Sequence, residues 1–264
     1  MLTFLKLGGS LITDKNKPSS AHVDLIRRIT QEIAHFHQQN PRSQLLIGHG
    51  SGSFGHIPAN EYGTRLGVHT RNQWSGFSKV WLEARTLNQI VVEQFAITGL
   101  PVISHAPSTA ITTENGRIIN WDVSTLKQAL QADLIPVIYG DVIFDQVLGG
   151  TILSTEELFY YLANIFHPER ILIAGIESGV FSDYPQNEQL IREITPTTYS
   201  SQQALILGSS AVDVTGGMAA KVENLVELVK DQPGIQAWIF PGIEQDSVYQ
   251  ALSGKPSRGT WIHY

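Results

Sequence analysis

The sequence predicts an α/β protein built around a mostly parallel sheet. Short apolar runs alternate with amphipathic stretches, the pattern of successive strand–helix–strand units. Two of the runs end in glycine-rich turns, at Lys6–Ser10 and Gly48–His56. A glycine-rich strand-to-helix turn exposes backbone N–H groups at a helix N-terminus and so favours anion binding. Two such turns predict two phosphates held face to face, as phosphoryl transfer requires.

The bulk composition limits the class of protein. A length of 264 residues fits one large α/β domain or two small ones, and 42% hydrophobic with 16% charged residues is typical of a globular protein. The net charge of −6 argues against a nucleic-acid partner, and the absence of cysteine excludes disulfides and thiolate metal sites. No apolar run approaches the roughly 18 residues of a membrane span. Met1–Lys6 is too short for a signal peptide, so we expect a cytoplasmic protein with no membrane partner.

The apolar runs predict strands in this order: Leu2–Leu7, Gln44–Gly48, Pro101–His105, Leu134–Tyr139, Arg170–Ala174 and Ala237–Phe240. Apolar spacings of three and four predict helices over about Ala21–Gln39, over Trp74–Ile97, and from Thr215-Gly216-Gly217 towards Lys230. Two segments break the alternation and predict hairpins: Ile111–Trp121, turning at Glu114–Gly116, and Val142–Leu153, turning through Gly149–Gly150. We expect a single domain over 1–264, with a soft boundary near Ala174–Gly175 between two lobes that share one sheet.

The first turn carries a candidate phosphate ligand. Lys6 ends a strand expected at the sheet centre, where a lysine needs an anionic partner. The alternative is a surface lysine before a tight turn. Lys15 lies in a polar loop typical of a solvated surface, and its closeness in sequence to Gly8–Ser10 makes it a second candidate.

The second turn contains a G-x-G-x-x-G pattern at Gly50–Gly55, so a dinucleotide-binding fold is a competing interpretation. The pattern follows the second strand instead of the first, and the next strand ends in Ser104-His105 without the expected acidic residue. His56 closes the turn, where an imidazole can donate to a phosphate oxygen or cap the following helix. We interpret His49 as structural.

A third glycine turn precedes the last predicted helix and places Lys221 one turn into it. This lysine either reaches an anion at the helix N-terminus or is an exposed helix residue. The chain contains no Walker A pattern, no protein-kinase element and no histidine pair with zinc spacing. We nominate no residue as a metal ligand.

Five segments in order, 6–10, 50–56, 139–142, 213–221 and 251–260, resemble the amino acid kinase superfamily, and most closely its isopentenyl phosphate kinases. The segment ending in His56 is the most specific, because the superfamily's carboxylate and amino-acid kinases generally lack this histidine, whereas isopentenyl phosphate kinases and the related fosfomycin kinase carry it. The resemblance implies a three-layer αβα sandwich with a mostly parallel central sheet and a homodimer. It also implies ATP with Mg²⁺ and transfer of the γ-phosphoryl group to a phosphate monoester, with isopentenyl phosphate as the best single acceptor.

The resemblance also implies site residues. The catalytic set would be Lys6, Lys15, His56 and Lys221. The ATP-binding set would be Lys6, Gly8, Gly9, Ser10, Ser51, Gly175, Gly179, Gly217 and Lys221. The set that binds the acceptor would be Gly50, Gly52, Gly55, His56, Ser154 and Thr155. The acceptor would lie in an N-terminal lobe, about 1–174, and the nucleotide in a C-terminal lobe, about 175–264. Because a phosphate monoester has a second pKa of about 6, it is mostly dianionic at pH 7 and needs no general base. Catalysis can then rest on positioning and charge neutralisation.

Three departures from the family pattern leave alternatives open. Ser154–Glu157 stands where these kinases have Ser-Gly-Asp-Asp, so Thr155 adds bulk and Glu156 is one methylene longer than the usual aspartate. Gly175–Val180 lacks both aspartates of Thr-Asp-Val-Asp-Gly-Val. Trp74 and Trp81 make the expected tail region bulky, which favours an acceptor that is smaller or of different shape. Together with Phe77 they either line a tail pocket or pack in the core. The alternatives are a kinase of another small phosphate or phosphonate, like fosfomycin kinase, and a non-catalytic nucleotide- or phosphate-binding homologue.

Overall fold

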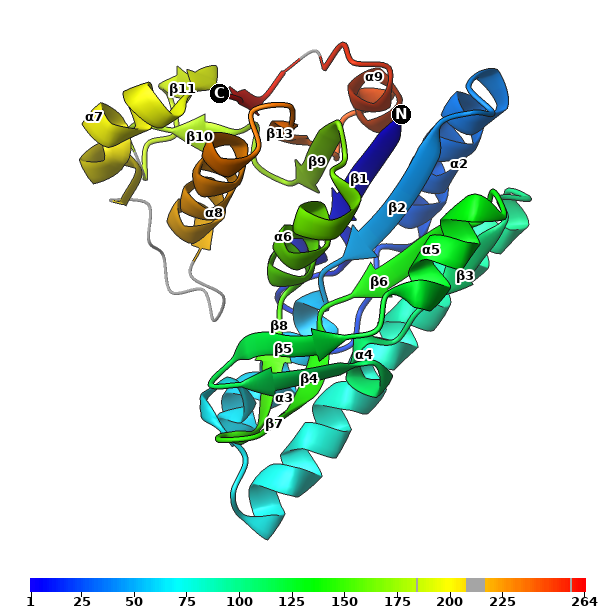
Figure 1. Cartoon of the computed structure of the whole chain (residues 1–264), viewed down its shortest axis with the longest axis vertical. Helices are drawn as coiled ribbons and strands as arrows, with labels where there is room; N and C mark the ends of the chain where they lie inside the picture. Colours follow the sequence, from blue (N-terminus) through cyan, green and yellow to red (C-terminus); the bar gives the residue numbers. More distant parts are fainter. Residues whose placement is uncertain (184, 208–216, 257) are drawn as a thin grey trace.

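The computed structural model describes residues 1–183, 185–207, 217–256 and 258–264. It confirms the three-layer arrangement of helices on both faces of a sheet (Figure 1). Within these residues the main sheet has eight strands, in the spatial order β12 (Glu193–Ile194), β14 (Thr260–Ile262), β13 (Gln236–Pro241), β9 (Arg170–Gly175), β1 (Leu2–Leu7), β2 (Gln44–His49), β6 (Ile135–Tyr139) and β3 (Val102–Ser104).

The main sheet is parallel from β13 to β3, which confirms the predicted mostly parallel sheet. The exception is β14, which runs antiparallel to β13, while β12 runs parallel to β14. The first strand, β1, lies in the middle and pairs with both β2 and β9. Because the strands are parallel and in register, Lys6 lies level with Gly48 and Ile173, and the carboxyl ends of the central strands meet at one edge.

The central strands β1, β2, β6 and β9 bury side chains on both faces, which explains why their sequences are almost continuously apolar. Phe4 packs into a core beneath α5 (Ser124–Gln131), α6 (Thr155–Phe166) and α8 (Gly217–Asp231). Its neighbour Leu5 packs on the opposite face, against α2 (Val23–Gln39), α4 (Arg71–Ile97) and α9 (Ser247–Leu252). The three predicted helices are therefore present as α2, α4 and α8. Helix α4 begins three residues earlier than predicted, because Thr70 and Gln73 form a capping box.

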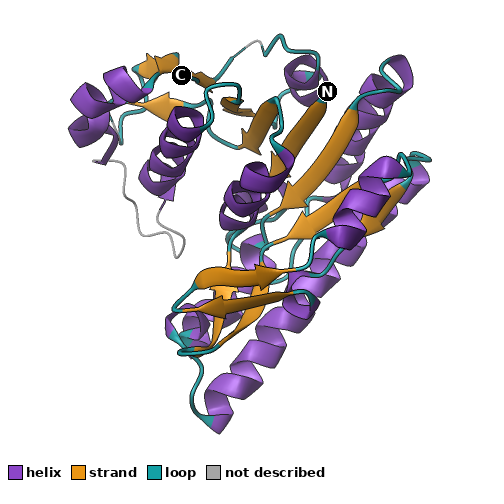
Figure 2. Ribbon diagram, viewed as in Figure 1, coloured by secondary structure: helices purple, strands orange, loops and turns teal. Residues whose placement is uncertain are grey.

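The two predicted hairpins join into a second sheet, of four strands within the described chain, which packs against α4 (Figure 2). Its spatial order is β5 (Arg117–Trp121), β4 (Ile111–Glu114), β7 (Asp141–Asp145) and β8 (Gly149–Leu153). The first hairpin turns at Asn115–Gly116 as predicted. The remaining elements are α1 (Gly9–Ile12), α3 (Gly52–Tyr62), α7 (Pro196–Leu207), the 3₁₀ turns η1 (Thr64–Leu66) and η2 (Pro107–Thr109), and the small β-ladder of β10 (Val180–Phe181) with β11 (Leu190–Ile191).

The predicted turn of the second hairpin is wrong, because β8 already begins at Gly149. The chain turns at residues 146–148, where the Asp145 carboxylate accepts from the N–H groups of Val147 and Leu148 at 2.9 and 2.8 Å. The glycines serve packing instead. A Cβ on Gly149 would collide with the carbonyl oxygen of Val68, and one on Gly150 would lie 2.8 Å from the ring of Phe77.

Candidate functional site

A cavity of about 570 Å³ lies at the carboxyl ends of β1, β2 and β9, the edge where parallel α/β sheets bind ligands. Every site residue predicted from the sequence lines it: Lys6, Gly8, Gly9, Ser10, Lys15, Gly50, Ser51, Gly52, Gly55, His56, Ser154, Thr155, Gly175, Gly179, Gly217 and Lys221. Segments separated by more than 200 residues thus meet in one place. Thr215 and Gly216, which the sequence placed in the third turn, lie outside the described residues.

The first glycine turn leads from β1 into α1. The N–H of Gly8 donates to the carbonyl oxygen of Ala174 at 2.8 Å, so the turn is anchored to the end of β9. A Cβ on Gly8 would lie 3.0 Å from the same oxygen, so the strands approach too closely there for a larger residue to fit without a shift. Ser10 lies in α1, and the exposed Lys15 follows in the next loop.

The two glycine turns contact each other directly through their backbones. A Cβ on Gly9 would lie 2.5 Å from the nitrogen of Gly52, and a Cβ on Gly50 would lie 2.8 Å from the nitrogen of Gly9. The hydroxyl of Thr13 ties the turns together, since it donates to the carbonyl oxygen of Gly9 at 2.8 Å and accepts from the N–H of Ser53 at 3.0 Å. Glycine is therefore required where the turns touch, and the two turns form a single unit.

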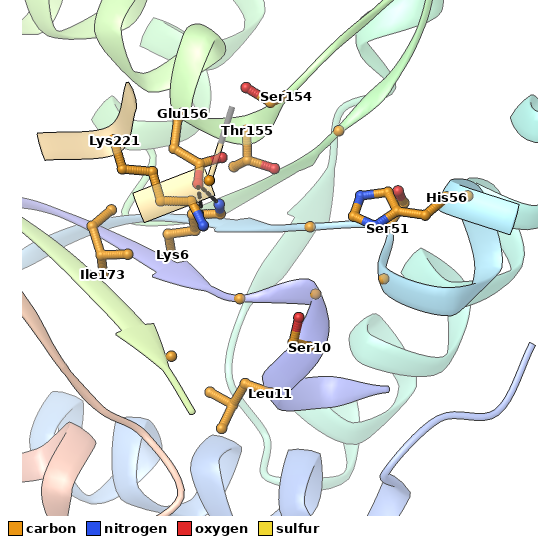
Figure 3. Close-up of a pocket in the computed structure, with 18 of the residues that line it drawn as sticks. Lys6, Ser10, Leu11, Ser51, His56, Ser154, Thr155, Glu156, Ile173 and Lys221 are labelled. Carbon is orange, nitrogen blue, oxygen red and sulfur yellow. Dashed lines mark ion pairs between the residues drawn. The ribbon is translucent and has the colours of Figure 1, made fainter. Parts of the chain in front are cut away.

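His56 lies in α3, the helix that follows the second turn. In the view of Figure 3 it projects beside Ser51, across the cavity from Lys6 and Lys221. Gly52 has a φ of +49°, a left-handed conformation that suits glycine, and its own Cβ would collide with the hydroxyl of Thr13. The sequence around His56 thus builds a tight turn that places the imidazole in the cavity, across from the two lysines.

A buried carboxylate lies between two lysines on the other side of the cavity. Glu156 pairs with the ammonium of Lys6 and with that of Lys221, whose Nζ lies 3.8 Å from Glu156 Oε1 (Figure 3). Burial alone would raise the pKa of Glu156, but the two ammonium charges outweigh it and lower the pKa to about 2. The extra methylene of Glu156 therefore does not prevent the acid from contacting both lysines.

Thr155 does not fill the cavity with its side chain, contrary to the bulk expected from the sequence. The residue is 1% exposed, its hydroxyl donates to the carbonyl oxygen of His49 at 2.6 Å, and its methyl group packs against Gly48. A Cβ on Gly48 would lie 2.5 Å from that methyl carbon. Because Gly48 has no side chain, there is room beside it for the side chain of Thr155.

His49 precedes the second glycine turn and is fully buried. Its Nδ1–H donates to the carbonyl oxygen of Gly50 at 3.1 Å, and Nε2 lies 3.1 Å from the amide nitrogen of Asn88, whose oxygen accepts from Ser104 at 2.6 Å. Burial, together with the nearby charge of Lys6, lowers the pKa of His49 to about 4. The imidazole is therefore neutral at pH 7, which fits the donor and acceptor arrangement.

Of the two interpretations left open for Trp74, Phe77 and Trp81, packing in the core agrees with the structure, because none of the three lines the cavity and all belong to one hydrophobic cluster. Trp74 and Phe77 pack with Phe144 at ring distances of 5.9 and 5.2 Å, beneath the second sheet. The lining residue from α4 is Val80, which lies on another side of the helix. Ile57, Ala59 and Ile152 are also apolar residues that line the cavity.

Several lining residues were not predicted. Asp141 belongs to a segment used for the family resemblance and is 1% exposed. Burial raises its pKa to about 6, although the N–H groups of Ser108 and Val142 donate to it at 3.1 and 2.9 Å. Phe181, Asn187 and Arg65 lie in segments without a recognisable motif, so no local signal marks them.

In the loop after β9, Gly179 has a φ of +143°, and a Cβ there would lie 2.7 Å from the hydroxyl of Thr260. That hydroxyl also accepts from the N–H of Val180 at 2.8 Å, so the loop after β9 is fastened to β14. Gly217 begins α8 with a φ of +65° and precedes Lys221 by one turn. In the described residues no helix is long and apolar enough to cross a membrane.

Comparison with known proteins agrees with this geometry. The profile of the amino acid kinase family matches residues 1–241. The chain is 32% identical to the isopentenyl phosphate kinase of Methanocaldococcus jannaschii over 100% of its own length and 99% of the relative's. It is also 32% identical to that of Methanothermobacter thermautotrophicus, over 99% and 98% of the two lengths. An X-ray structure of isopentenyl phosphate kinase superposes with a TM-score of 0.83 at 28% identity, covering 99% of this chain and 100% of the other. The chain therefore belongs to the amino acid kinase family.

Proposed function

We propose that this protein is an ATP-dependent kinase that transfers the γ-phosphoryl group to isopentenyl phosphate and forms isopentenyl diphosphate. The observation that carries the proposal is the backbone contact between two anion-binding glycine turns inside a cavity that also holds three lysines and a histidine. Full-length similarity to proteins named isopentenyl phosphate kinase supports this choice of acceptor.

The ATP side comprises the first turn and the elements packed against it. We assign the ATP phosphates to Lys6, Gly8, Gly9, Ser10, Ser51, Gly217 and Lys221, and the rest of the nucleotide to the region of Gly175 and Gly179. Lys15, on the exposed loop after α1, would neutralise the transferring group. The support is that all of these residues line one cavity and that two of the lysines are already held side by side by Glu156.

The acceptor side comprises the second turn and the start of α6. We assign the acceptor phosphate to the N–H groups of Gly50, Gly52 and Gly55, to the imidazole of His56 and to Ser154. Thr155 can take part through its backbone, because its hydroxyl already donates to His49. The apolar lining from Ile57, Ala59, Val80 and Ile152 would contact the hydrocarbon tail.

The chemistry requires charge neutralisation and alignment more than proton transfer. The acceptor is a dianion at neutral pH, since the second pKa of a phosphate monoester is about 6, so it attacks without a general base. Two anions repel as they approach, and the lysines, His56 and the helix N-termini offset that repulsion. The rigid contact between the turns would fix the in-line geometry.

Mg²⁺ enters this proposal as part of the ATP substrate. The acidic side chains that line the cavity in the described residues are Asp141, Glu156 and Glu177. Glu156 is held by two lysines and Asp141 by backbone N–H groups, and nowhere in the described chain do three acidic or histidine side chains converge. The metal would therefore take its oxygen ligands chiefly from the ATP phosphates and water.

We also propose the division into an acceptor lobe, about 1–174, and a nucleotide lobe, about 175–264, and a homodimer. The edge strand β3 supports the dimer, since Ile103 on it is 40% exposed and an apolar sheet edge favours pairing with a second copy. Light scattering after size exclusion would show twice the 29.1 kDa mass of one chain. A monomer at micromolar concentration would contradict the dimer. The cytoplasmic location expected from the sequence stays a prediction.

The function is tested by incubating the purified protein with Mg-ATP and isopentenyl phosphate. We expect ADP release that depends on the acceptor and a diphosphate product in the phosphorus NMR spectrum. Lys6→Ala, prepared in parallel, controls for contaminating kinases and should be inactive. Folded protein that shows no acceptor-dependent ADP release would overturn the proposal. A preference for another phosphate or a phosphonate such as fosfomycin would favour the alternative kinase, and ATP binding without any transfer would favour the non-catalytic homologue.

A further inference from the structure

Arg65 is a cationic residue that lines the cavity and has no role in the proposed transfer. It lies in η1, just after α3, and lines the cavity near Ile152 and Ser154. Its side chain is 29% exposed, so most of that side chain is withdrawn from water. A half-buried arginine needs specific acceptors, and the structure provides them.

The acceptors belong to β8 and α6. The two Nη atoms of Arg65 donate to the two carboxylate oxygens of Glu157 at 2.9 and 2.8 Å, and Nη1 also donates to the carbonyl oxygen of Ile152. A bidentate arginine–carboxylate pair fixes orientation as well as distance, because both groups are planar. Lysine, with a single ammonium, cannot reproduce that geometry.

Glu157 has a second task in the same place. Its Oε2 accepts from the N–H of Ser154 at 2.7 Å, while its own N–H donates to the Ser154 hydroxyl at 3.2 Å, which completes the capping box of α6. The preceding acid, Glu156, holds Lys6 and Lys221. The first turn of α6 therefore holds the ATP-side lysines with one acid and Arg65, on the acceptor side, with the next.

The backbone of the same segment is fastened to the second sheet. The Thr151 hydroxyl donates to the carbonyl oxygen of Arg65 at 3.0 Å, and the N–H of Val68 donates to the carbonyl oxygen of Leu148 at 2.8 Å. Helix α3, which carries His56, is thus held at its start by the glycine turn and at its end by the Arg65 segment. The Arg65–Glu157 pair links this helix to the start of α6.

We propose that Arg65 is a positioning residue for the acceptor: through Glu157 it sets the separation of His56 on α3 from Ser154 at the start of α6, between which the acceptor phosphate binds. The inference rests on the proposed function. In this proposal the Arg65–Glu157 pair serves the acceptor half of the cavity as the Lys6–Glu156 pair serves the ATP half. Loss of the pair should therefore weaken acceptor binding selectively and leave ATP binding nearly unchanged.

The test compares steady-state constants of Arg65→Gln, Arg65→Lys, Glu157→Gln and the double variant with the wild type. We expect Arg65→Gln to raise the KM for isopentenyl phosphate at least about tenfold, the effect of losing one charge-assisted interaction, while the KM for ATP changes less than about twofold. The KM of Arg65→Lys for isopentenyl phosphate should lie between those of the wild type and Arg65→Gln, because one point charge retains part of the attraction. If Arg65 acts through Glu157, the double variant should be no worse than the poorer single variant.

Lys79→Gln is the matched control, since Lys79 and Glu61 form an exposed pair at 3.2 Å that also links α3 to α4. It should leave both KM values unchanged. Thermal melting of each variant separates misfolding from loss of binding. Unchanged acceptor KM in a folded Arg65→Gln, or equal increases in both KM values, would overturn the proposal.

Binding of isopentenyl phosphate without ATP, measured by calorimetry, provides a readout that needs no turnover. If the wild type phosphorylates the acceptor and Arg65→Gln binds it with equal affinity, the positioning role is contradicted and the proposed function stands. A wild type that neither binds nor phosphorylates isopentenyl phosphate contradicts the proposed function, and the inference about Arg65 falls with it.

Discussion

At the scale of single residues, Glu156 provides a counter-ion for Lys6 and Lys221. Lys6 is 5% exposed, and a buried ammonium without an anionic partner carries a desolvation cost of several kcal/mol. Glu156 offsets that cost in the free protein. ATP phosphates would then join a cluster whose geometry already exists.

Glu156→Gln should therefore destabilise the free protein by about 3 kcal/mol, the usual order for removing one member of a buried pair. Inorganic pyrophosphate should recover part of that loss by supplying the missing negative charge to the lysines. The measurement is the free energy of unfolding in urea with and without pyrophosphate. Glu244→Gln, at an exposed pair with Arg258 3.9 Å away, is the control. An equal pyrophosphate effect in wild type and Glu156→Gln would refute the explanation.

His49 should make stability depend on pH in the acid range. Its folded pKa of about 4 lies below the unfolded value of 6.5, so the unfolded chain binds the proton first. The stabilising contribution is complete above pH 6.5 and is lost as the pH falls towards 4, by up to about 3 kcal/mol. Asp141 has a folded pKa raised to about 6, so its contribution has the opposite sign: the stability of the folded protein rises as the pH falls below 6 and Asp141 takes up its proton.

His49→Asn keeps a donor near the carbonyl oxygen of Gly50 and removes the titration. Urea unfolding at several pH values from 7 to 4 should show the stability advantage of the wild type shrinking as the pH falls. The contribution of Asp141 is present in both proteins and cancels in the difference. A difference that stays constant with pH would show that His49 does not titrate as described.

At the scale of elements, the contact between the glycine turns is the tightest constraint on the site. A Cβ at Gly9 has no room, since it would lie 2.5 Å from the backbone nitrogen of Gly52. The first turn can yield only by moving away from the second. Such a shift would separate the donor and acceptor phosphates that we place there.

Gly9→Ala should therefore lower kcat by about 100-fold, the scale expected for a misplacement of about 1 Å between reacting groups. Stability should fall by about 1–3 kcal/mol from overpacking. Gly234→Ala, where a Cβ would meet nothing within 4 Å, should change neither quantity. Steady-state assays and urea unfolding test this, and wild-type kcat in Gly9→Ala would contradict it.

The elements also show which features a sequence can reveal. The strands and glycine turns were predictable because their signals are local: apolar runs, adjacent glycines and a lysine at a strand end. The second hairpin turn was not, because Asp145 organises it while also accepting from the N–H groups of Asn115 and Gly116, about 30 residues away. The direction of the Thr155 side chain depends on the space beside Gly48 in another strand, and no pattern within one segment records that contact.

At the scale of the whole molecule, one cavity receives residues from both proposed lobes. The acceptor assignment places its ligands in the second turn and at the start of α6, and the nucleotide assignment places its ligands in the loop after β9 and at the start of α8. Arg65, Phe181 and Asn187 reach the cavity only because the fold brings separate segments together, so no local pattern marks them.

Hydrogen exchange should distinguish the two halves of the cavity. Isopentenyl phosphate alone should slow amide exchange mainly in residues 50–62 and 152–157, because binding to the folded form suppresses local opening. ADP alone should act mainly on 175–181 and 217–221. Peptide-resolved mass spectrometry provides the measurement. The reverse pattern would contradict the assignment of the lobes, and inorganic sulfate controls for general anion effects.

The place of β1 in the middle of the sheet also has a consequence for the order of folding during synthesis. Its partner β2 emerges from the ribosome soon after it, whereas β9 follows only after 162 residues that separate Leu7 from Arg170. Until then the Gly8 amide lacks the Ala174 oxygen to which it donates in the finished protein. Contacts this distant in sequence form slowly. The first glycine turn is therefore among the last parts of the cavity to reach its final shape, although it is among the first to be synthesised.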